Sequence, residues 1–203
     1  MKPSRIALVA GAAFAVLASF YVVFLVMSDT RQTSFRTVSS TGTASIGGPF
    51  ELVDDRGNSV TQADLIGKPS AIFFGFTYCP DVCPTTLFEF AALIEQLGPD
   101  ADKMNFVMVT VDPERDTPEI LHEYVTAFDE RIRGFTGTPE QVARIVEAYK
   151  VHYERVETDQ DYTLNHTASV YLMDSANAFA GTITYHEDPS TALEKLRRLI
   201  ANA

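Results

Sequence analysis

The sequence predicts an α/β fold in which a mixed central sheet is flanked by helices. Segments typical of strands alternate with segments of helical periodicity between residues 50 and 201. The chain of 203 residues is 46% hydrophobic and 21% charged, which suits one domain with a buried core. An uncharged apolar run at 6–27 predicts an N-terminal transmembrane helix ahead of that domain.

The apolar run at 6–27 is about as long as a helix that crosses a bilayer. A cleaved signal peptide is the alternative, but its apolar region spans about 7 to 15 residues and ends in a small-x-small site. Here the run ends in bulky residues at 21–25. Lys2 and Arg5 precede it and favour a cytoplasmic N-terminus. We expect a single-pass protein of the inner (cytoplasmic) membrane with its globular domain on the periplasmic side.

Three segments follow from this division of the chain. Residues 1–28 form the expected membrane anchor, 29–48 a flexible linker rich in Ser, Thr and Gly, and 49–203 the globular domain. The formal net charge of the whole chain is −11. This acidity argues against a nucleic-acid partner.

The first half of the domain is predicted from its apolar patterns. After short strand segments that flank a turn at 55–58, residues 70–78 form a nearly continuous apolar run, as in a strand buried on both faces. Residues 84–98 have helical spacing at Leu87, Phe90, Ile94 and Leu97, and Gly98 ends the pattern. A second strand is predicted at 105–112.

The second half of the domain is predicted from helix-start residues and a hairpin pattern. A helix at 116–129 carries Pro118 in its first turn, and Thr138 and Gln141 form a capping-box pattern that opens a helix at 138–153. Strands at 167–174 and 178–185 form a predicted hairpin, and a final helix spans 190–201. The expected order is strand, helix, strand, helix, helix, hairpin, helix.

Cys79 and Cys83 are the only cysteines and lie between the buried strand and the first helix. Loops at the carboxyl edge of such a sheet gather ligand sites, and a helix N-terminus favours a thiolate. Two thiolates are soft ligands that select Cu(I), or Zn(II) when other ligands complete a tetrahedron. A stabilising disulfide is the alternative, but closing so short a loop removes little chain entropy. The pair is also able to act as a redox-active dithiol.

One of the four histidines is a candidate third ligand. His122 is expected on a solvated helix face, His152 at the end of a helix, and His186 exposed after the hairpin. His166 instead stands directly before the predicted strand at 167–174, which should run antiparallel to the central strand. The imidazole should therefore arrive beside the cysteine loop. Two thiolates and one imidazole would make a compact three-ligand site.

The stretches "FGFTYCPDVCPTTL", "VTVDPERDTPE" and "NHTASVYLMD" occur in this order and resemble the Sco/SenC family of membrane-anchored copper proteins. The resemblance covers about residues 45–201 and includes the N-terminal anchor. It implies a thioredoxin-like fold, one copper ion held by Cys79, Cys83 and His166, and cysteines that cycle between dithiol and disulfide. It also implies a role in assembly of the dinuclear copper site of cytochrome c oxidase.

The chain departs from the family pattern at one position, and it differs from ordinary thioredoxin-like reductases at another. Many relatives carry an acidic residue just before the histidine, whereas Asn165 stands here, which should weaken a charge-assisted contact to the ligand. Ordinary thioredoxin-like reductases carry a cis-proline facing the cysteine pair, but no proline occurs between Pro139 and Pro189.

The segment 111–118 should lie at the same sheet edge as the cysteines. Asp112, Arg115 and Asp116 would there dock a partner or orient the metal loop. The alternative is local: Asp116 or Thr117 caps the next helix, and Arg115 forms a surface ion pair.

The expected function is that of a copper chaperone rather than an enzyme. Cu(I) or Cu(II) would come from an upstream copper donor and pass to the copper-site subunit of cytochrome c oxidase, or the protein would prepare that site. The main alternative is a membrane-anchored thiol-disulfide oxidoreductase that reduces the cysteines of the partner copper site, served by an upstream thiol reductase. A thiol peroxidase that uses Arg115, and a zinc site completed by water, are weaker alternatives.

Overall fold

The structure is a computed structural model that describes residues 46–159 and 161–203. The expected anchor, and the linker as far as residue 45, lie outside the described residues. Within them, the strands are β1 (Glu51–Asp54), β2 (Ser59–Thr61), β3 (Ser70–Gly75), β4 (Asn105–Thr110), β5 (Ile132–Thr136), β6 (Tyr153–Glu157), β7 (Tyr162–His166), β8 (Val170–Met173) and β9 (Phe179–Ile183). The α-helices are α2 (Val82–Leu97), α3 (Pro118–Thr126), α4 (Pro139–Ala148) and α5 (Pro189–Ala201), and the 3₁₀ helices are η1 (Gln62–Leu65) and η2 (Gly98–Lys103).

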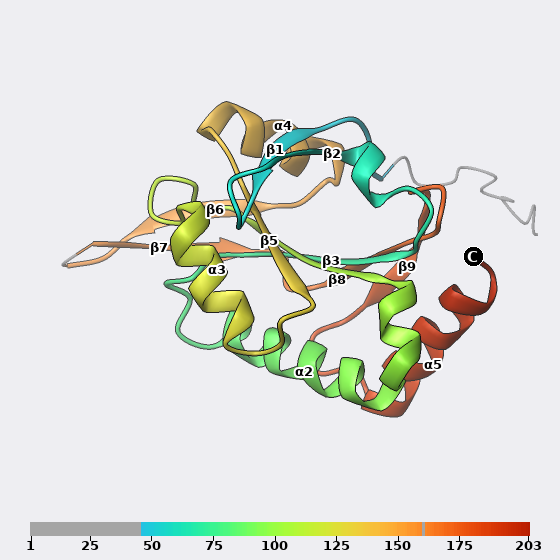
Figure 1. Ribbon diagram of the computed structural model, residues 1–203. Helices are drawn as coiled ribbons and strands as arrows, with labels where there is room; N and C mark the ends of the chain where they lie inside the picture. Colours follow the sequence, from blue (N-terminus) through green and yellow to red (C-terminus); the bar gives the residue numbers. More distant parts are fainter. Residues whose placement is uncertain (1–45, 160) are drawn as a thin grey trace, which may run out of the picture. The chain divides into compact units, whose positions relative to one another are not determined.

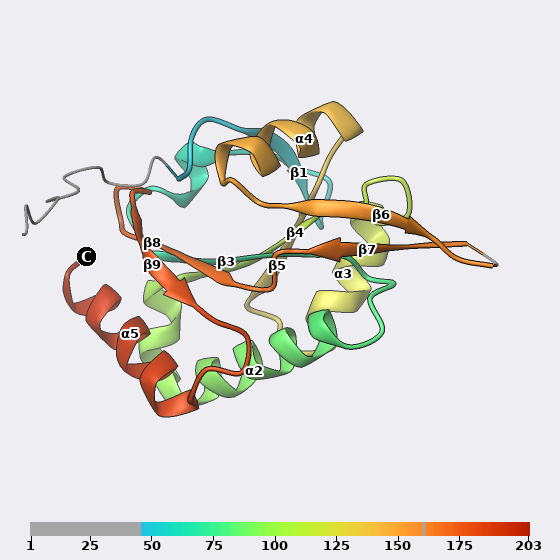
Figure 2. The same ribbon diagram turned by 180° about the vertical axis from the view of Figure 1, so that it is seen from behind.

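Seven strands form one mixed sheet in the order β2-β1-β5-β4-β3-β8-β9. The central strands β3, β4 and β5 are parallel, while β8 runs antiparallel to β3 and β1 antiparallel to β5. Helix α4 lies on one side of this sheet, and α2, α3 and α5 lie on the other (Figures 1 and 2). The predicted α/β fold with a mixed sheet and helices on both faces is confirmed.

Strand β3 forms the centre of the core because all six of its residues are buried. Phe73 and Phe74 are fully buried, and helix α2 presents Leu87, Phe90 and Ile94 to the same core. A central strand paired on both edges must be apolar on both faces, which explains the continuous apolar run in the sequence. This rigid strand leads directly into the cysteine loop.

Several predicted boundaries are wrong. The predicted strand at 70–78 ends at Gly75, and the helix predicted from residue 84 begins at Val82, so Cys83 lies inside the first turn of α2. The helix predicted at 138–153 ends at Ala148, because buried Tyr149 caps it and Lys150 adopts a positive φ of 56°. The strand β5 was not predicted, since Arg133 and Gly134 interrupt its apolar pattern.

Strands β6 and β7 were also not predicted. They form a separate two-stranded antiparallel sheet that projects from the domain (Figures 1 and 2). Every residue of β6 is exposed. The sequence therefore has no alternation of apolar and polar residues there from which a strand could be predicted. The polar stretch before His166, which reads as loop from its composition, is therefore the second half of this hairpin, and His166 ends β7 instead of beginning β8.

The domain includes a short stretch before β1. Ile46 packs against the core, and the Gly47 amide donates to the Ala148 carbonyl over 2.9 Å. No helix in the described part of the chain combines the length and apolar character that a membrane crossing requires.

Candidate metal centre

The cysteine loop joins the carboxyl end of β3 to the amino end of α2. Cys79 precedes the helix, and the backbone amide of Cys83 in the first helical turn donates to Cys79 Sγ over 3.4 Å. Free amides at a helix N-terminus normally require such an acceptor. Both cysteines are free thiols in this structure; Cys79 is half-buried and Cys83 is 0% exposed.

Gly75 makes room for the buried thiol. A Cβ added at this position would lie 2.8 Å from Cys83 Sγ and 2.7 Å from Cε1 of Phe73. Any side chain larger than hydrogen would therefore displace the sulfur or the aromatic ring. The close approach of strand backbone to ligand explains glycine at the end of β3.

His166 reaches the cysteines from β7. Its Nε2 lies 3.4 Å from Cys83 Sγ, and its Nδ1 lies 3.0 Å from the carbonyl oxygen of Thr167. That carbonyl accepts a hydrogen bond from Nδ1–H, which leaves Nε2 available as a ligand atom. The rings of Phe73 and Phe76 each contact the imidazole edge-to-face at centroid distances of 5.8 Å and hold its orientation.

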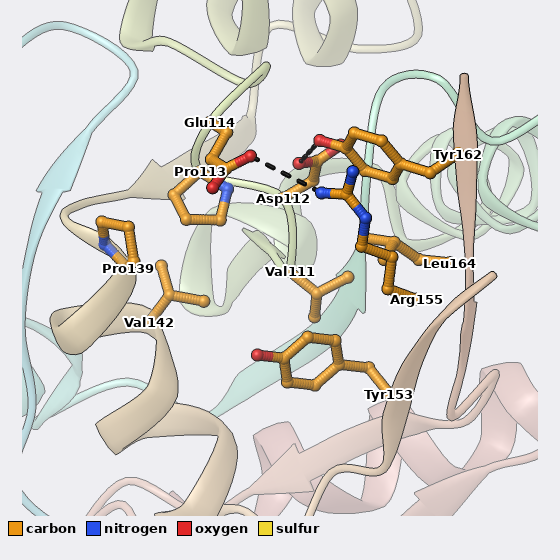
Figure 3. Close-up of a pocket in the computed structure, with 10 residues that line it drawn as sticks. All are labelled: Val111, Asp112, Pro113, Glu114, Pro139, Val142, Tyr153, Arg155, Tyr162 and Leu164. Atoms are coloured by element: carbon orange, nitrogen blue, oxygen red, sulfur yellow. Dashed lines mark hydrogen bonds and ion pairs between the residues drawn. The ribbon is translucent and has the colours of Figure 1, made fainter. Parts of the chain in front are cut away.

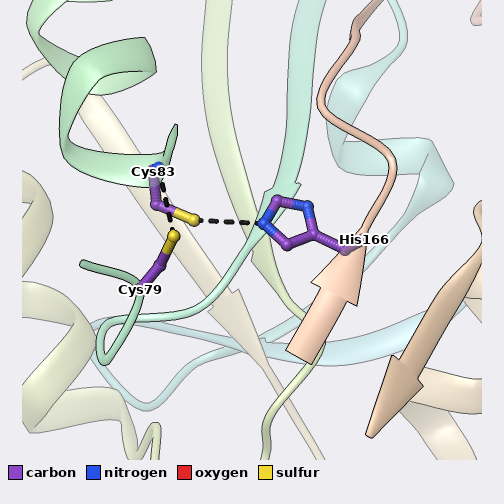
Figure 4. Close-up of side chains that lie close together, drawn as sticks. All are labelled: Cys79, Cys83 and His166. Atoms are coloured by element: carbon purple, nitrogen blue, oxygen red, sulfur yellow. Dashed lines mark hydrogen bonds between the residues drawn. The ribbon is translucent and has the colours of Figure 1, made fainter. Parts of the chain in front are cut away.

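The structure thus brings Cys79, Cys83 and His166 together, with both sulfurs and Nε2 turned toward a common point (Figure 4). Their ligand atoms all lie within 4.8 Å of one another. Around a zinc ion, thiolate sulfur lies at about 2.3 Å and imidazole nitrogen at about 2.0 Å, so two ligand atoms lie at most about 4.6 Å apart. Two sulfurs and one imidazole nitrogen also suit copper. The donor set fits a single first-row metal ion after a small movement.

The two thiols differ in acidity. The hydrogen bond with Cys83 lowers the pKa of Cys79 well below its ordinary value, and His166 acts in the same direction. The hydrogen bond to Cys79 raises the pKa of Cys83, and burial raises it further. The expected depressed pKa therefore belongs to Cys79, the more accessible sulfur, which is the nucleophile of the pair in the metal-free dithiol.

Asp116 connects the cysteine loop to the rest of the sheet. Its carboxylate is 0% exposed and accepts hydrogen bonds from the Thr77 amide and hydroxyl and from the Thr110 hydroxyl. Burial raises the pKa of Asp116, while the bonds from Thr110 and Thr77 oppose that rise. Thr117, not Asp116, caps helix α3. Of the two readings of Asp116, orientation of the metal loop is the one that its contacts support.

Arg115 ties the hairpin to the sheet edge. Its guanidinium contacts Asp112 and Asp161, donates to the Tyr162 carbonyl over 3.2 Å, and lies 3.7 Å from the centre of the Tyr162 ring. It is more than the surface ion pair considered from the sequence. Tyr162 in turn donates to Asp112 over 2.8 Å.

A pocket of about 240 Å³ lies beneath the hairpin (Figure 3). Across it, Arg155 of β6 lies 3.8 Å from Glu114, and its guanidinium stacks on the Tyr162 ring at 3.5 Å. Tyr162 and Arg155 were not predicted as functional residues, because only the tertiary fold places them beside segment 111–118. These contacts hold the strand that carries His166.

The other histidines lie away from the cysteines. His122 on α3 contacts Asp55 through Nδ1 at 2.7 Å and is about half exposed. His152 is exposed, as is His186, which has a positive φ of 60°. The prediction that His152 ends a helix is wrong, because it lies between α4 and β6.

A groove of about 280 Å³ opens beside the metal ligands. The cysteine loop lines one side with Phe76 and residues 79–82, and β7 lines the other with residues 163–166. Cys79 and His166 face this groove, whereas Cys83 lies behind them in the core. An incoming ligand therefore meets Cys79 and His166 first.

Comparison with known proteins agrees with this geometry. Residues 38–201 match the SCO1/SenC family. The chain is 43% identical over 136 residues to Protein SCO1 homolog 1, mitochondrial, of Arabidopsis thaliana, covering 66% of this chain and 41% of that protein. It is 38% identical over 179 residues to Protein SenC of Rhodobacter capsulatus, covering 88% of this chain and 81% of that protein.

A solved structure has the same fold. Bradyrhizobium japonicum ScoI with copper bound superposes with a TM-score of 0.72 and 45% sequence identity, covering 76% of this chain and 99% of that one. The thioredoxin-like architecture implied by the sequence resemblance is therefore confirmed for the domain. The relative with 45% identity binds copper on this scaffold.

Proposed function

The chain belongs to the SCO1/SenC family, and from this premise we propose that it is a copper chaperone. Cys79, Cys83 and His166 bind one copper ion, and the protein delivers it to the dinuclear copper site of cytochrome c oxidase. The observation that carries the proposal is the convergence of two thiols and an imidazole from segments 83 positions apart. The copper-bound relative supports copper as the ion.

Three donors suit transfer better than storage. Soft thiolates give affinity for Cu(I), and a set of only three protein ligands leaves a position for a ligand of the recipient. Cys79 and His166 border the groove and can exchange with that ligand, while buried Cys83 is reached last. Cargo copper then passes between proteins without release of a free ion.

The metal-binding part of the proposal is tested by single substitutions. Cys79→Ser, Cys83→Ser and His166→Ala are expected each to weaken Cu(I) binding by at least tenfold, measured anaerobically by competition with a chromophoric Cu(I) chelator. His152→Ala is the matched control, because its side chain is exposed outside the donor set, and it should retain wild-type affinity. Wild-type affinity in His166→Ala would remove the third ligand from the proposal.

A second candidate function is reduction of the recipient's cysteines before copper arrives. The observation that favours it is the lowered pKa of Cys79 beside a second free thiol. Reduction of a disulfide-bonded peptide by the metal-free dithiol, compared between wild type and His166→Ala, separates the two functions. Loss of copper affinity with retained reduction would show that both chemistries use the same loop.

We further propose the placement of the chain in the cell. Residues 1–28 anchor it in the inner membrane, the following residues as far as the packed stretch at Ile46 form the linker, and the copper-binding domain lies on the periplasmic side. The support is the uncharged run at 6–27 preceded by Lys2 and Arg5. Protease added to spheroplasts should cleave the domain, while protease added to inverted membrane vesicles should not; the reverse pattern would refute the orientation.

A further inference from the structure

The outer edge of β7 has backbone groups available for pairing. The Thr158 amide donates to the Asp161 carbonyl, and the Thr167 amide donates to the His152 carbonyl. Hydrogen-bonded pairs alternate along an antiparallel ladder. Between these two ends, the residues of β7 whose backbone amides and carbonyls bond to β6 are therefore Thr163 and Asn165. The amides and carbonyls of Leu164 and His166 therefore point away from β6. Among the described residues, β7 pairs with no strand other than β6.

This edge faces the groove beside the metal ligands. Residues 163–166 form one wall of the groove, and Cys79, Pro80, Asp81 and Val82 form part of the opposite wall. The outer edge of β6 differs, because β6 carries Glu154, Arg155 and Glu157. Charged side chains of this kind protect sheet edges from pairing. Strand β7 has no Asp, Glu, Lys or Arg in the sequence YTLNH.

We propose that the copper recipient docks by adding an extended antiparallel segment to the outer edge of β7. The inference rests on the proposed function and names how the recipient is recognised. Main-chain bonds to Leu164 and His166 would supply general affinity, as in other cases of strand addition. The groove between β7 and the cysteine loop has room for such a segment, and the backbone amides and carbonyls of Leu164 and His166 are available to pair with it.

The pairing register would bring a ligand to the copper. The side chains of Leu164 and His166 lie on the same face of β7, since residues two apart share a face. A residue paired with His166 has its Cβ about 4.5–5.5 Å from the His166 Cβ, on the face that looks toward Cys83. A cysteine there would be within ligand-exchange reach, and an apolar residue two positions later would pair with Leu164. The recipient segment thus has the pattern Cys-x-apolar.

The charge of the surroundings adds a further requirement. The hairpin from Tyr153 to His166 contains four acidic residues and one basic residue, Arg155. Arg155 contacts Glu114 and Glu157, so its charge is already paired. Asp81 is exposed on the opposite wall of the groove. The segment should therefore carry basic residues on either side of the Cys-x-apolar pattern.

Backbone methylation of a synthetic peptide tests the proposal. The probe is the peptide Lys-Thr-Cys-Thr-Val-Lys, labelled with a fluorophore and titrated onto the copper-loaded full chain in detergent micelles. N-methylation of its cysteine removes the amide that faces His166 and should weaken binding about tenfold. N-methylation of the following threonine, whose amide points away from β7, is the matched control and should change binding less than twofold. Equal effects of the two methyl groups would overturn the proposal.

Hydrogen exchange provides a second test on the metal-free, reduced full chain, with a peptide in which serine replaces the cysteine. The amides of Leu164 and His166 should exchange at least tenfold more slowly when the peptide is bound, while Thr163 and Asn165 should not change. Protection without copper binding by the chain would uphold the docking edge and refute the chaperone function. Copper binding without protection at Leu164 and His166 would refute the docking edge alone.

Discussion

Gly75→Ala should damage the metal site without removing a ligand. The new Cβ would lie 2.8 Å from Cys83 Sγ, whereas unstrained contacts between carbon atoms lie at about 3.5–4.0 Å. If the backbone of β3 stays in place, the sulfur has to move by about 0.7–1.2 Å, as judged from that carbon contact range. Geometric tolerance for metal-ligand distances is about 0.2 Å, so this shift is several times too large.

The same substitution also disturbs the third ligand. The Cβ would lie 2.7 Å from Cε1 of Phe73, and the Phe73 ring packs against His166. We expect the affinity for Cu(I) to fall about 10- to 100-fold, the range found when groups that orient metal ligands are changed. Anaerobic competition with a chromophoric Cu(I) chelator measures this loss.

Gly134→Ala is the control because it also crowds the sheet, away from the cysteines. Its Cβ would lie 3.1 Å from the Leu121 Cβ and 3.3 Å from the Asp55 Cβ. Overpacking of this kind costs about 1–3 kcal/mol of stability in either variant. Thermal unfolding should show a lower midpoint for both variants, but only Gly75→Ala should lose copper affinity. Wild-type affinity in a folded Gly75→Ala protein would refute the role assigned to Gly75.

Three further predictions concern the groups around the site. Arg115→Lys should raise amide exchange rates in β6 and β7 about tenfold, because lysine cannot reproduce the planar contacts to Asp112, Asp161 and the Tyr162 ring; unchanged exchange would show that Arg115 does not hold the hairpin. Asp116 has a raised pKa in the fold, so its contribution to stability is present at low pH and is lost as pH rises through that value. The wild-type free energy of urea unfolding minus that of Asp116→Asn should therefore fall as pH rises from the ordinary pKa of an aspartate through the raised pKa of Asp116, and a difference independent of pH would contradict the shift. For Cys79, alkylation of the metal-free wild-type dithiol should be nearly as fast at pH 6 as at pH 8, because the hydrogen bond with Cys83 keeps the pKa of Cys79 low. A thiol of ordinary pKa would instead react about 75-fold faster at pH 8.

The lowered pKa of Cys79 also has a consequence for stability. Because this pKa is lower in the fold than in the unfolded chain, the thiolate stabilises the metal-free fold above the unfolded value. That contribution decreases as pH falls from the unfolded pKa toward the folded one. Copper binding keeps the dependence on this thiol within the same range, since the bound sulfur stays deprotonated while the thiol of the unfolded chain takes up a proton.

Local features of the fold could be predicted because their causes lie close together along the chain. The apolar run ending at Gly75 predicts a central strand, and Thr138 with Gln141 forms the capping box expected from the sequence. The position of Cys79 and Cys83 between a strand and a helix follows from the same local patterns. The hairpin of β6 and β7 could not be found in this way, since Leu164 is the only buried residue of its two strands and the other contacts are arginine stacking on Tyr162 and ion pairs.

The sequence by itself determined the donor types, the spacing of the two thiols and the strand that leads to them, because each depends on neighbouring residues. It also pointed to His166, through the expectation that its segment runs antiparallel to the central strand. Only the tertiary structure decided that the imidazole comes from the end of a projecting hairpin, that Cys83 is buried in the first turn of α2, and that Gly75 leaves space for its sulfur. These depend on pairing and packing between residues far apart in the chain, and no local pattern encodes the distance between such groups.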